Sequence, residues 1–419
     1  MKSRLKNISV PAGPSAFPAW LVLTLFALCF SNPLSAIEVE PMAPGSYPVG
    51  TTNLRVTDEF AAYGKEQRDV SLNGKVGPGG ERLFFSDQLQ NPDTSWVIHV
   101  EVPDDSKTYG NIAGISLPVV IYLNYPTTPD NNRAHYPFPF PDAEDSEMHH
   151  MQGPGEQPIF ADDQQRYPLV LISHGRNVHG IWEVTHARRL ASHGYITITV
   201  NYGDRRISDP GRPFLDTLFR PLAGKAVLDH VLASEAFGGH IDPSRIATSG
   251  HSLGGFTSLA LAGGRYLDHS GSFSDPRIRA VVAASPWVGG GGFSGDYFLF
   301  ADKNNGLADI KVPVLTTFGT NDISTPMNTI LPAVQNLSGP RYVIELVDQP
   351  HVYEPGSWQD LGNWELVFLS AYLKDDPQSL EKLRTGSSMQ GGNRDVQHFD
   401  LQRLPDVYLW KKGAPGLIN

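Results

Sequence analysis

The chain has 419 residues, of which 40% are hydrophobic and 18% are charged, so it can bury a large core and is not a disordered chain. Its formal net charge is −11, from 33 basic and 44 acidic residues, without a run of lysine or arginine. An acidic chain of this kind binds nucleic acid poorly, so we expect no nucleic-acid partner.

Residues 1–36 have the features of a secretory signal. Three basic residues precede a 12-residue apolar core at residues 19–30, and Ala36 offers a cleavage position. This core is shorter than the ~20 apolar residues that span a bilayer. We therefore predict a removable signal and a secreted or periplasmic protein with no stable membrane span after processing; an uncleaved N-terminal anchor is the alternative.

Cys29 lies inside that segment and is the only cysteine of the chain. The processed protein would therefore contain no cysteine. This excludes thiolate catalysis and cysteine-ligated zinc, and it predicts a fold that its core stabilises without disulfides.

The first strand-like runs are residues 96–102 and 117–123, after an extended and glycine-rich start. Residues 124–166 are polar and rich in proline, which predicts a long loop insertion before the regular part of the fold. Within it, His149 and His150 lie near Asp145 and Glu147. A metal site and a solvated acidic loop are both compatible with this cluster, and the loop is preferred because no ligand spacing such as HxxxH is present.

From residue 167 onward, predicted strands alternate with predicted helices. The strands are 167–173, 195–202, 245–250, 277–285, 312–319 and 341–347, and the helices are 182–194, 220–236, 254–264 and 361–375. This alternation predicts an α/β domain with a mostly parallel central sheet and helices on both faces. We expect the domain to span residues 37–375 and the polar, glycine-rich residues 376–419 to form a wrapped tail.

The segment GHSLG, residues 250–254, fits the pattern G-x-S-x-G where a predicted strand runs into a predicted helix. In such a turn the flanking glycines make room for a strained serine whose hydroxyl is exposed at the edge of the sheet. Ser252 is therefore the predicted nucleophile. A glycine-rich turn with an ordinary serine is the alternative, and the strand before the motif, the helix after it and the additional Gly255 argue against it.

A serine hydroxyl needs a base, and the base needs a carboxylate that holds its tautomer. Asp322 follows one predicted strand, 70 residues after Ser252, and His351 follows the next, 29 residues later. Both lie past the carboxyl ends of strands, where open α/β sheets place their ligands. Asp322 is therefore the predicted acid and His351 the predicted base. Asp348 competes for the acid but is displaced along the loop.

Further residues are assigned to the surroundings of this triad. The backbone N–H of Leu253, directly after the nucleophile, and that of Arg176, in the turn after strand 167–173, are the predicted oxyanion-hole donors. His251 would point away from the serine hydroxyl and is assigned, with Trp287, to substrate binding. Four other histidines are predicted to be structural or to line the cleft: His174, His179, His186 and His193.

The chain resembles the α/β-hydrolase superfamily, in the branch of dienelactone-hydrolase-like proteins, platelet-activating-factor acetylhydrolases and cutinase-like polyester hydrolases. The resemblance covers residues 167–373 and rests on YPLVLISHG, LASHGYITITVNY, DPSRIATSGHSLGG, AASPW and VPVLTTFGTND. It implies an α/β-hydrolase fold with a Ser-Asp-His triad. Trp287, in SPW, matches a substrate-contacting tryptophan of the polyester hydrolases; a packed loop aromatic is the alternative.

Two positions depart from parts of that branch. Dienelactone hydrolases proper use a cysteine where this chain has Ser252, and the acid of plasma-type acetylhydrolases would fall near Ser285. An acid at Asp322 is similar to the cutinase-like arrangement.

The sequence thus predicts a serine hydrolase of the esterase, lipase or cutinase type that cleaves small or polymeric carboxylic esters through an acyl-serine. It predicts no metal or organic cofactor. An acyltransferase or peptidase with the same triad, and a non-catalytic exported binding protein on a hydrolase scaffold, are the alternatives.

Overall fold

The computed structural model describes residues 38–52, 89, 96–133, 148–151, 155–176, 178, 180–207, 214–266, 272–289, 306–386, 388–392, 396–404 and 407–412. The predicted signal segment, with Cys29, lies outside the described residues, as does His179. Among the described helices, none combines the length and the apolar character needed to cross a membrane.

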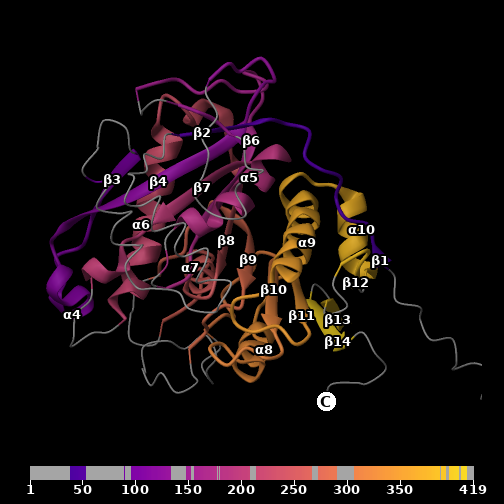
Figure 1. Cartoon of the computed structure of the whole chain (residues 1–419). Coiled ribbons are helices and arrows are strands. Elements are labelled where there is room, and N and C mark those ends of the chain that lie inside the picture. Colours follow the sequence, from indigo (N-terminus) through magenta and orange to yellow (C-terminus); the bar gives the residue numbers. More distant parts are fainter. Residues whose placement is uncertain are drawn as a thin grey trace, which may run out of the picture. The chain divides into compact units, whose positions relative to one another are not determined.

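A mixed sheet of twelve strands, counted over the described residues, forms the centre of the fold (Figure 1). Its strands are β2 (Val49–Thr51), β3 (Trp96–Glu101), β4 (Ser116–Pro126), β5 (His149–His150), β6 (Tyr167–Ser173), β7 (Ile196–Asn201), β8 (Ile241–His251), β9 (Ile278–Ala284), β10 (Val314–Gly319), β11 (Arg341–Leu346), β13 (Val396–Leu404) and β14 (Val407–Lys412). Their order is β14-β13-β11-β10-β9-β8-β6-β7-β4-β2-β5, and β3 pairs with β4. A separate parallel pair joins β1 (Glu38–Val39) to β12 (Ser388–Met389).

The six central strands, from β7 to β11 in this order, pair in parallel. Antiparallel strands continue the sheet on both sides, β4 next to β7 and β13 next to β11. The prediction of a mostly parallel central sheet is therefore confirmed. Because parallel strands end at one edge, the loops after β6, β8, β10 and β11 come together there.

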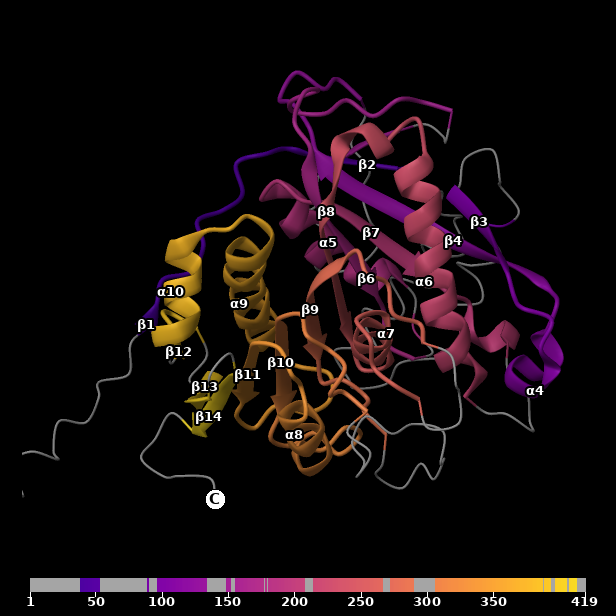
Figure 2. The ribbon, with the colours of Figure 1, turned by 180° about the vertical axis from the view of Figure 1, so that it is seen from behind.

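Helices cover both faces of the sheet, as predicted. They are α4 (Ser106–Tyr109), α5 (Val184–Ser192), α6 (Leu215–Ala233), α7 (Leu253–Leu261), α8 (Met327–Gln335), α9 (Pro355–Leu373) and α10 (Pro377–Thr385), with short 3-10 turns at Gly110–Ile112, Gly180–Glu183, Asp204–Ile207 and Gly238–His240. One apolar core joins α6, α7 and α8 to the sheet, and a second joins α5, α9 and α10 to its other face. In Figure 2, α6 lies in front of β4.

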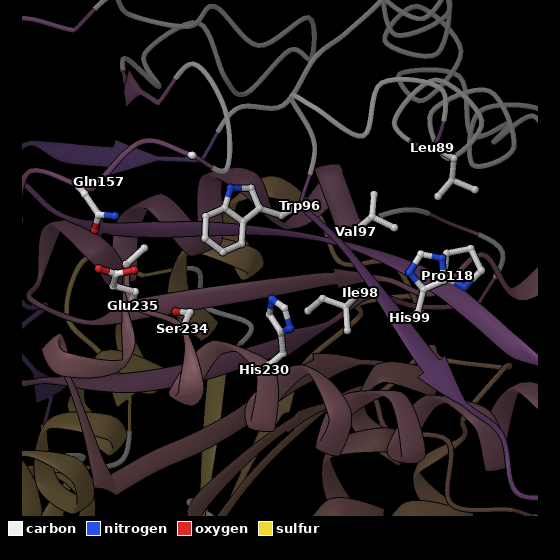
Figure 3. A pocket seen from close by; sticks show the side chains of 12 residues that line it. Leu89, Trp96, Val97, Ile98, His99, Pro118, Gln157, His230, Ser234 and Glu235 are labelled. Carbon is white, nitrogen blue, oxygen red and sulfur yellow. The ribbon is translucent and has the colours of Figure 1, made fainter.

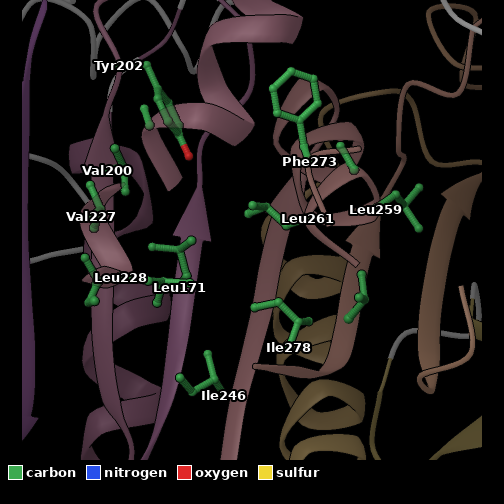
Figure 4. Packing of buried hydrophobic residues seen from close by; sticks show 14 of the residues in the cluster. Leu171, Val200, Tyr202, Val227, Leu228, Ile246, Leu259, Leu261, Phe273 and Ile278 are labelled. Carbon is green, nitrogen blue, oxygen red and sulfur yellow. The ribbon is translucent and has the colours of Figure 1, made fainter. Parts of the chain in front are cut away.

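Strand β6 contributes side chains to the apolar cores on both faces of the sheet. Its side chains alternate, so that Leu169 and Leu171 belong to the first core while Val170 and Ile172 belong to the second. Figure 4 shows Leu171 beside Leu228 of α6. An almost continuous apolar run is what a strand buried on both faces requires.

Two segments predicted to be irregular contain regular elements. Strand β4 extends to Pro126 and β5 pairs in parallel with β2, so the predicted insertion at 124–166 is not a single loop; its residues 134–147 and 152–154 lie outside the described residues. Beyond residue 375, α10 follows, and β13 pairs with β11 in the register Val343↔Phe399. The sheet therefore continues past residue 375, through β13 and β14, which the sequence pattern had not indicated as strands.

Candidate active site

Strand β8 delivers Ser252 to the carboxyl edge of the sheet. The strand ends at His251 and α7 begins at Leu253, so Ser252 alone makes the turn, with φ of 56° and ψ of −117°. Such a conformation costs a non-glycine residue about 1–3 kcal/mol and persists only where the surroundings impose it. The Ser252 N–H donates to the Ala284 carbonyl (2.9 Å), and the Trp287 N–H donates to the Ser252 carbonyl (3.0 Å).

The glycines around Ser252 permit a close approach of α7 to the sheet. A Cβ on Gly254 would lie 1.9 Å from the Ser173 carbonyl oxygen, and one on Gly250 would lie 2.5 Å from the Gly254 carbonyl carbon. Gly255 has a similar contact with Pro286, 2.9 Å from its Cβ. Any side chain at the first two positions would collide with backbone, so the motif needs glycine for space.

Three side chains from three separate loops meet at this edge. His351 Nε2 lies 2.9 Å from Ser252 Oγ, and His351 Nδ1 lies 2.8 Å from Asp322 Oδ2. Because a carboxylate only accepts, Nδ1 carries the proton and Nε2 is free to accept the serine hydroxyl. The structure thus brings together the residues predicted to be nucleophile, base and acid.

Asp322 is buried and strongly hydrogen-bonded. Its Oδ1 accepts the N–H groups of Ser324 and Thr325 (both 2.8 Å), and the Thr325 hydroxyl lies 2.7 Å from Oδ2. Burial alone would raise the pKa of Asp322, but hydrogen bonds from His351 and Thr325 outweigh it and lower that pKa to about 2. The rival carboxylate, Asp348, contacts Thr320 and Asn321 through its backbone.

His251 contacts the loop that carries His351. Its Nε2 donates to the backbone carbonyl of His351 (2.7 Å), and the two rings lie 4.7 Å apart between centroids. Trp358 packs against the ring from α9 (5.3 Å). Burial and the nearby His351 ring lower the pKa of His251 to about 3, so the ring is neutral. These contacts tie His251 to the loop of His351, and its assignment to substrate binding stays a prediction.

Trp287 lies next to Ser252 through a backbone hydrogen bond. Its ring is partly buried against Phe214 and Phe256, at 5.2 and 5.8 Å between centroids. The Arg176 guanidinium also lies over the Phe214 ring, 5.0 Å from its centroid. The indole is therefore only partly buried, and the contact with Ser252 comes from the Trp287 backbone N–H.

The two predicted oxyanion donors lie on elements that flank Ser252. Leu253 is the first residue of α7, where an N–H has no acceptor within the helix. On the other side, the Cβ position of Gly175 is 3.8 Å from Ser252 Cβ and 3.5 Å from His251 Nδ1. The loop after β6, residues 174–176, therefore runs directly beside the nucleophile.

Two residues of α6, Asp216 and Arg220, lie next to that loop and were not among the predicted site residues. Arg220 is completely buried and donates to the carbonyls of His174 and Gly175. The available signal was a charged residue next to the apolar run at the start of predicted helix 220–236. Pattern alone did not distinguish Arg220 from a solvated charge, because the two carbonyls that it contacts lie 46 and 45 residues away in sequence.

The cavity in Figure 3 lies away from these residues. It has a volume of about 740 Å³ and is lined by residues of β3 and the C-terminal end of α6, among them Trp96, Ile98, His230 and Ser234. None of Ser252, Asp322 and His351 lines it. Ser234 follows Asp216, which lies beside the site, by 18 positions along α6, about 27 Å at 1.5 Å per residue.

The histidines of the predicted metal cluster are partly placed. His149 Nδ1 lies 3.1 Å from the Arg133 carbonyl oxygen, while Asp145 and Glu147 lie outside the described residues. Over the described part of the chain, no group of three or more histidine, aspartate and glutamate side chains is arranged to hold a metal ion.

Comparisons with known proteins agree with this fold. No family model matches the chain. Similar curated proteins include Cutinase est1 of Thermobifida alba, Cutinase 2 of Thermobifida cellulosilytica and Cutinase cut1 of Thermobifida fusca, each 26% identical over 203 residues. The aligned segment is 47% of this chain and 58%, 65% and 54% of those three proteins, so it spans little more than half of their length. Together with the parallel sheet, they identify an α/β-hydrolase fold and suggest a serine ester hydrolase; the dienelactone-hydrolase and acetylhydrolase branches stay predictions.

Proposed function

We propose that this protein is an exported serine hydrolase that cleaves carboxylic esters through an acyl-serine intermediate. One observation carries the proposal: the chain Ser252 Oγ, His351 and Asp322, linked at 2.9 and 2.8 Å, with the serine on a strained strand-to-helix turn. A poor nucleophile, a base within hydrogen-bonding distance and a carboxylate that holds the base are the parts that acyl transfer needs. Export is proposed from the signal-like composition of residues 1–36.

The chemistry follows from this geometry. His351 Nε2 takes the proton as Ser252 Oγ attacks the ester carbonyl, and Asp322 stabilises the imidazolium that forms. The N–H groups of Leu253 and Arg176 hold the oxyanion of the tetrahedral intermediate. His351 then protonates the leaving alcohol, and a water molecule that His351 deprotonates releases the acid from Ser252. No metal or organic cofactor takes part in these steps.

The surroundings of the triad favour an apolar ester. Ile323 and Val352, directly after Asp322 and His351, are 92% and 62% exposed, and Trp287 is accessible at the same edge. Exposed aliphatic side chains beside a reactive group favour an apolar acyl chain or a polymeric ester as the substrate. The similarity to cutinases supports the same choice.

Replacement of the nucleophile tests the proposal. Ser252→Ala should lower kcat on a graded set of p-nitrophenyl esters by about 10⁴-fold or more, and a fluorophosphonate probe should label the parent protein at Ser252. Ser244→Ala, which changes an exposed serine near the start of β8, is the matched control and should keep full activity. Normal turnover by Ser252→Ala, or no labelling at Ser252, would refute the assignment.

The alternatives with the same triad are separated by their products. Hydrolysis predicts free acid even when an alcohol competes with water, whereas an acyltransferase yields the new ester. A peptidase would cleave amides in a matched panel at rates comparable with esters. A non-catalytic binding protein would show neither labelling nor turnover.

A further inference from the structure

Arg220 of α6 is fully buried and all three of its nitrogens are engaged. Its Nη1 donates to the His174 carbonyl (2.5 Å) and its Nη2 to the Gly175 carbonyl (3.0 Å). Its Nε and Nη2 also form a two-pronged ion pair with Asp204, at 2.9 and 2.5 Å. Hydrogen bonds from an ionised donor are about twice as strong as neutral ones, so this loop is held firmly.

A hydrogen bond within the loop, made by the His174 side chain, also stabilises it. This buried ring donates from Nδ1 to the Gly175 carbonyl (2.7 Å), and its Nε2 accepts the Tyr202 N–H (3.4 Å). Burial and the adjacent Arg220 lower the pKa of His174 to about 3, which keeps the ring in this neutral form. The Gly175 carbonyl therefore accepts two hydrogen bonds, one from His174 and one from Arg220.

The orientation of the Gly175 carbonyl determines the orientation of the Arg176 N–H, because the two groups share a trans peptide bond. The Gly175 carbonyl and the Arg176 N–H belong to one planar peptide group, and in the trans form they point in opposite directions. Holding the carbonyl toward Arg220 turns the Arg176 N–H away from Arg220. Without that hold, the flexible backbone of Gly175 would allow the peptide to rotate.

The side chain of Arg176 is anchored from the same helix. Its Nε donates to Asp216 Oδ2 (2.8 Å), and Asp216, in the first turn of α6, is itself buried. The guanidinium also lies over Phe214, the residue before α6. The Gly175 carbonyl and the Arg176 side chain thus both bond to residues of α6.

We propose that Arg220 and Asp216 are positioning residues that orient the Gly175–Arg176 peptide so that its N–H serves as an oxyanion donor. The inference rests on the proposed function and adds a new role for α6. An oxyanion donor is effective because it is already oriented before charge develops, and a buried ion pair below the loop supplies that preorganisation. Neither residue touches the reacting atoms.

A double-mutant cycle tests the anchor of Arg176. Arg176→Ala and Asp216→Asn both keep the backbone N–H, so each should lower kcat per titrated active site by about 10-fold with little change in KM. The double variant should show no loss beyond that of Arg176→Ala, because Arg176→Ala removes and Asp216→Asn weakens the same contact. Additive losses, or full activity in both single variants, would overturn the proposal.

Arg220→Lys tests the ion pair below the loop. Lysine keeps the charge opposite Asp204 but loses the planar fork that reaches both carbonyls. We expect kcat per titrated site to fall by about 10²-fold, the size of effect seen when one oxyanion donor is lost. Arg265→Ala, which removes an exposed ion pair with Asp309, is the control and should keep full activity.

An inhibitor pair separates positioning from a merely structural role. A trifluoromethyl ketone forms an oxyanion on Ser252, so its affinity should fall by the same factor as kcat/KM in each variant. The matched alkyl ether forms no oxyanion and should bind all folded variants equally. A purely structural role predicts fewer titratable sites with unchanged kcat per site and unchanged ketone affinity. If Ser252→Ala retains turnover, the proposed function has failed; if only the Arg220, Arg176 and Asp216 variants retain it, this inference alone has failed.

Discussion

The two sides of Ser252 are built differently. On the histidine side, Asp322 accepts a hydrogen bond from Nδ1 of His351, whose side chain is 21% exposed. On the oxyanion side, two guanidiniums and two carboxylates lie below the loop, and Arg220 is fully buried. Proton transfer requires that His351 can gain and lose a proton. Stabilisation of the oxyanion requires only that the backbone N–H groups of the loop keep a fixed orientation.

The carboxylates of the two sides also differ in their pKa. Hydrogen bonds lower the pKa of Asp322 to about 2, against the effect of burial. Burial and the neighbouring Asp204 raise the pKa of Asp216 to about 6, against the attraction of Arg176 and Arg220. The two sides are therefore expected to respond to acid in opposite ways.

The largest effect on kcat is expected from removing the carboxylate that orients His351. Asp322→Asn should lower kcat by about 10³- to 10⁴-fold without unfolding the protein, because the amide favours the wrong tautomer of His351. Kinetics on a p-nitrophenyl ester and circular dichroism would measure both quantities. Asp348→Asn, on the loop of His351, is the control. A large loss in the control with none in Asp322→Asn would move the acid to Asp348.

Gly254 connects the turn at Ser252 to the oxyanion side through its contact with Ser173. Gly254→Ala should lower the free energy of unfolding by about 3 kcal/mol or more, since its Cβ would lie 1.9 Å from a carbonyl oxygen. Urea unfolding measures this change. Gly239→Ala, where no atom lies within 4 Å of the new Cβ, should change stability by less than about 1 kcal/mol. Equal effects would contradict the close packing of α7 on β6.

A smaller effect distinguishes Asp216 from Asp322 by how the free energy of unfolding depends on pH. The folded pKa of Asp216 is raised, so its contribution to stability is present below pH 3.8 and is lost as pH rises through 6. Asp322 has the opposite sign, and its contribution is lost as pH falls from 3.8 toward 2. Asp216→Asn should therefore be about 1–2 kcal/mol more stable relative to the parent at pH 7.5 than at pH 4. Urea unfolding at both pH values checks the sign of this difference. Equal stability differences at the two pH values would mean that the pKa of Asp216 is not raised in the folded protein.

The smallest effect concerns the support of His351 by His251. His251→Phe keeps an aromatic ring but loses the N–H donor to the His351 carbonyl, so kcat should fall by about threefold to tenfold with KM unchanged. Steady-state kinetics on one short ester measures this. A change in KM alone would restore the predicted substrate-binding role.

Much of the fold was predictable because its signals are local. The predicted strand 167–173 coincides with β6, and predicted strands and helices correspond to β7, β8, β9, β10 and β11 and to α5, α6, α7 and α9. Helix α8 and the strands after residue 375 were missed. Strand β13 pairs with β11 through backbone hydrogen bonds, and its sequence lacks the continuous apolar run of the buried central strands.

The candidate triad was predictable for a related reason. A strained serine needs glycines beside it in the chain, and an acid and a base at strand ends have a fixed order along the sequence. His251 was harder, because its neighbour in sequence is Ser252 while its hydrogen-bond partner is a carbonyl 100 residues away.

The sequence by itself determined the alternation of strands and helices, the turn at Ser252 and the order of Ser252, Asp322 and His351, since each depends on residues adjacent in the chain or on the parallel sheet. Only the tertiary structure decided which carbonyls Arg220 would reach, which way His251 would face and how the sheet ends. Those outcomes depend on contacts between segments far apart in sequence, where packing and burial select one partner among many.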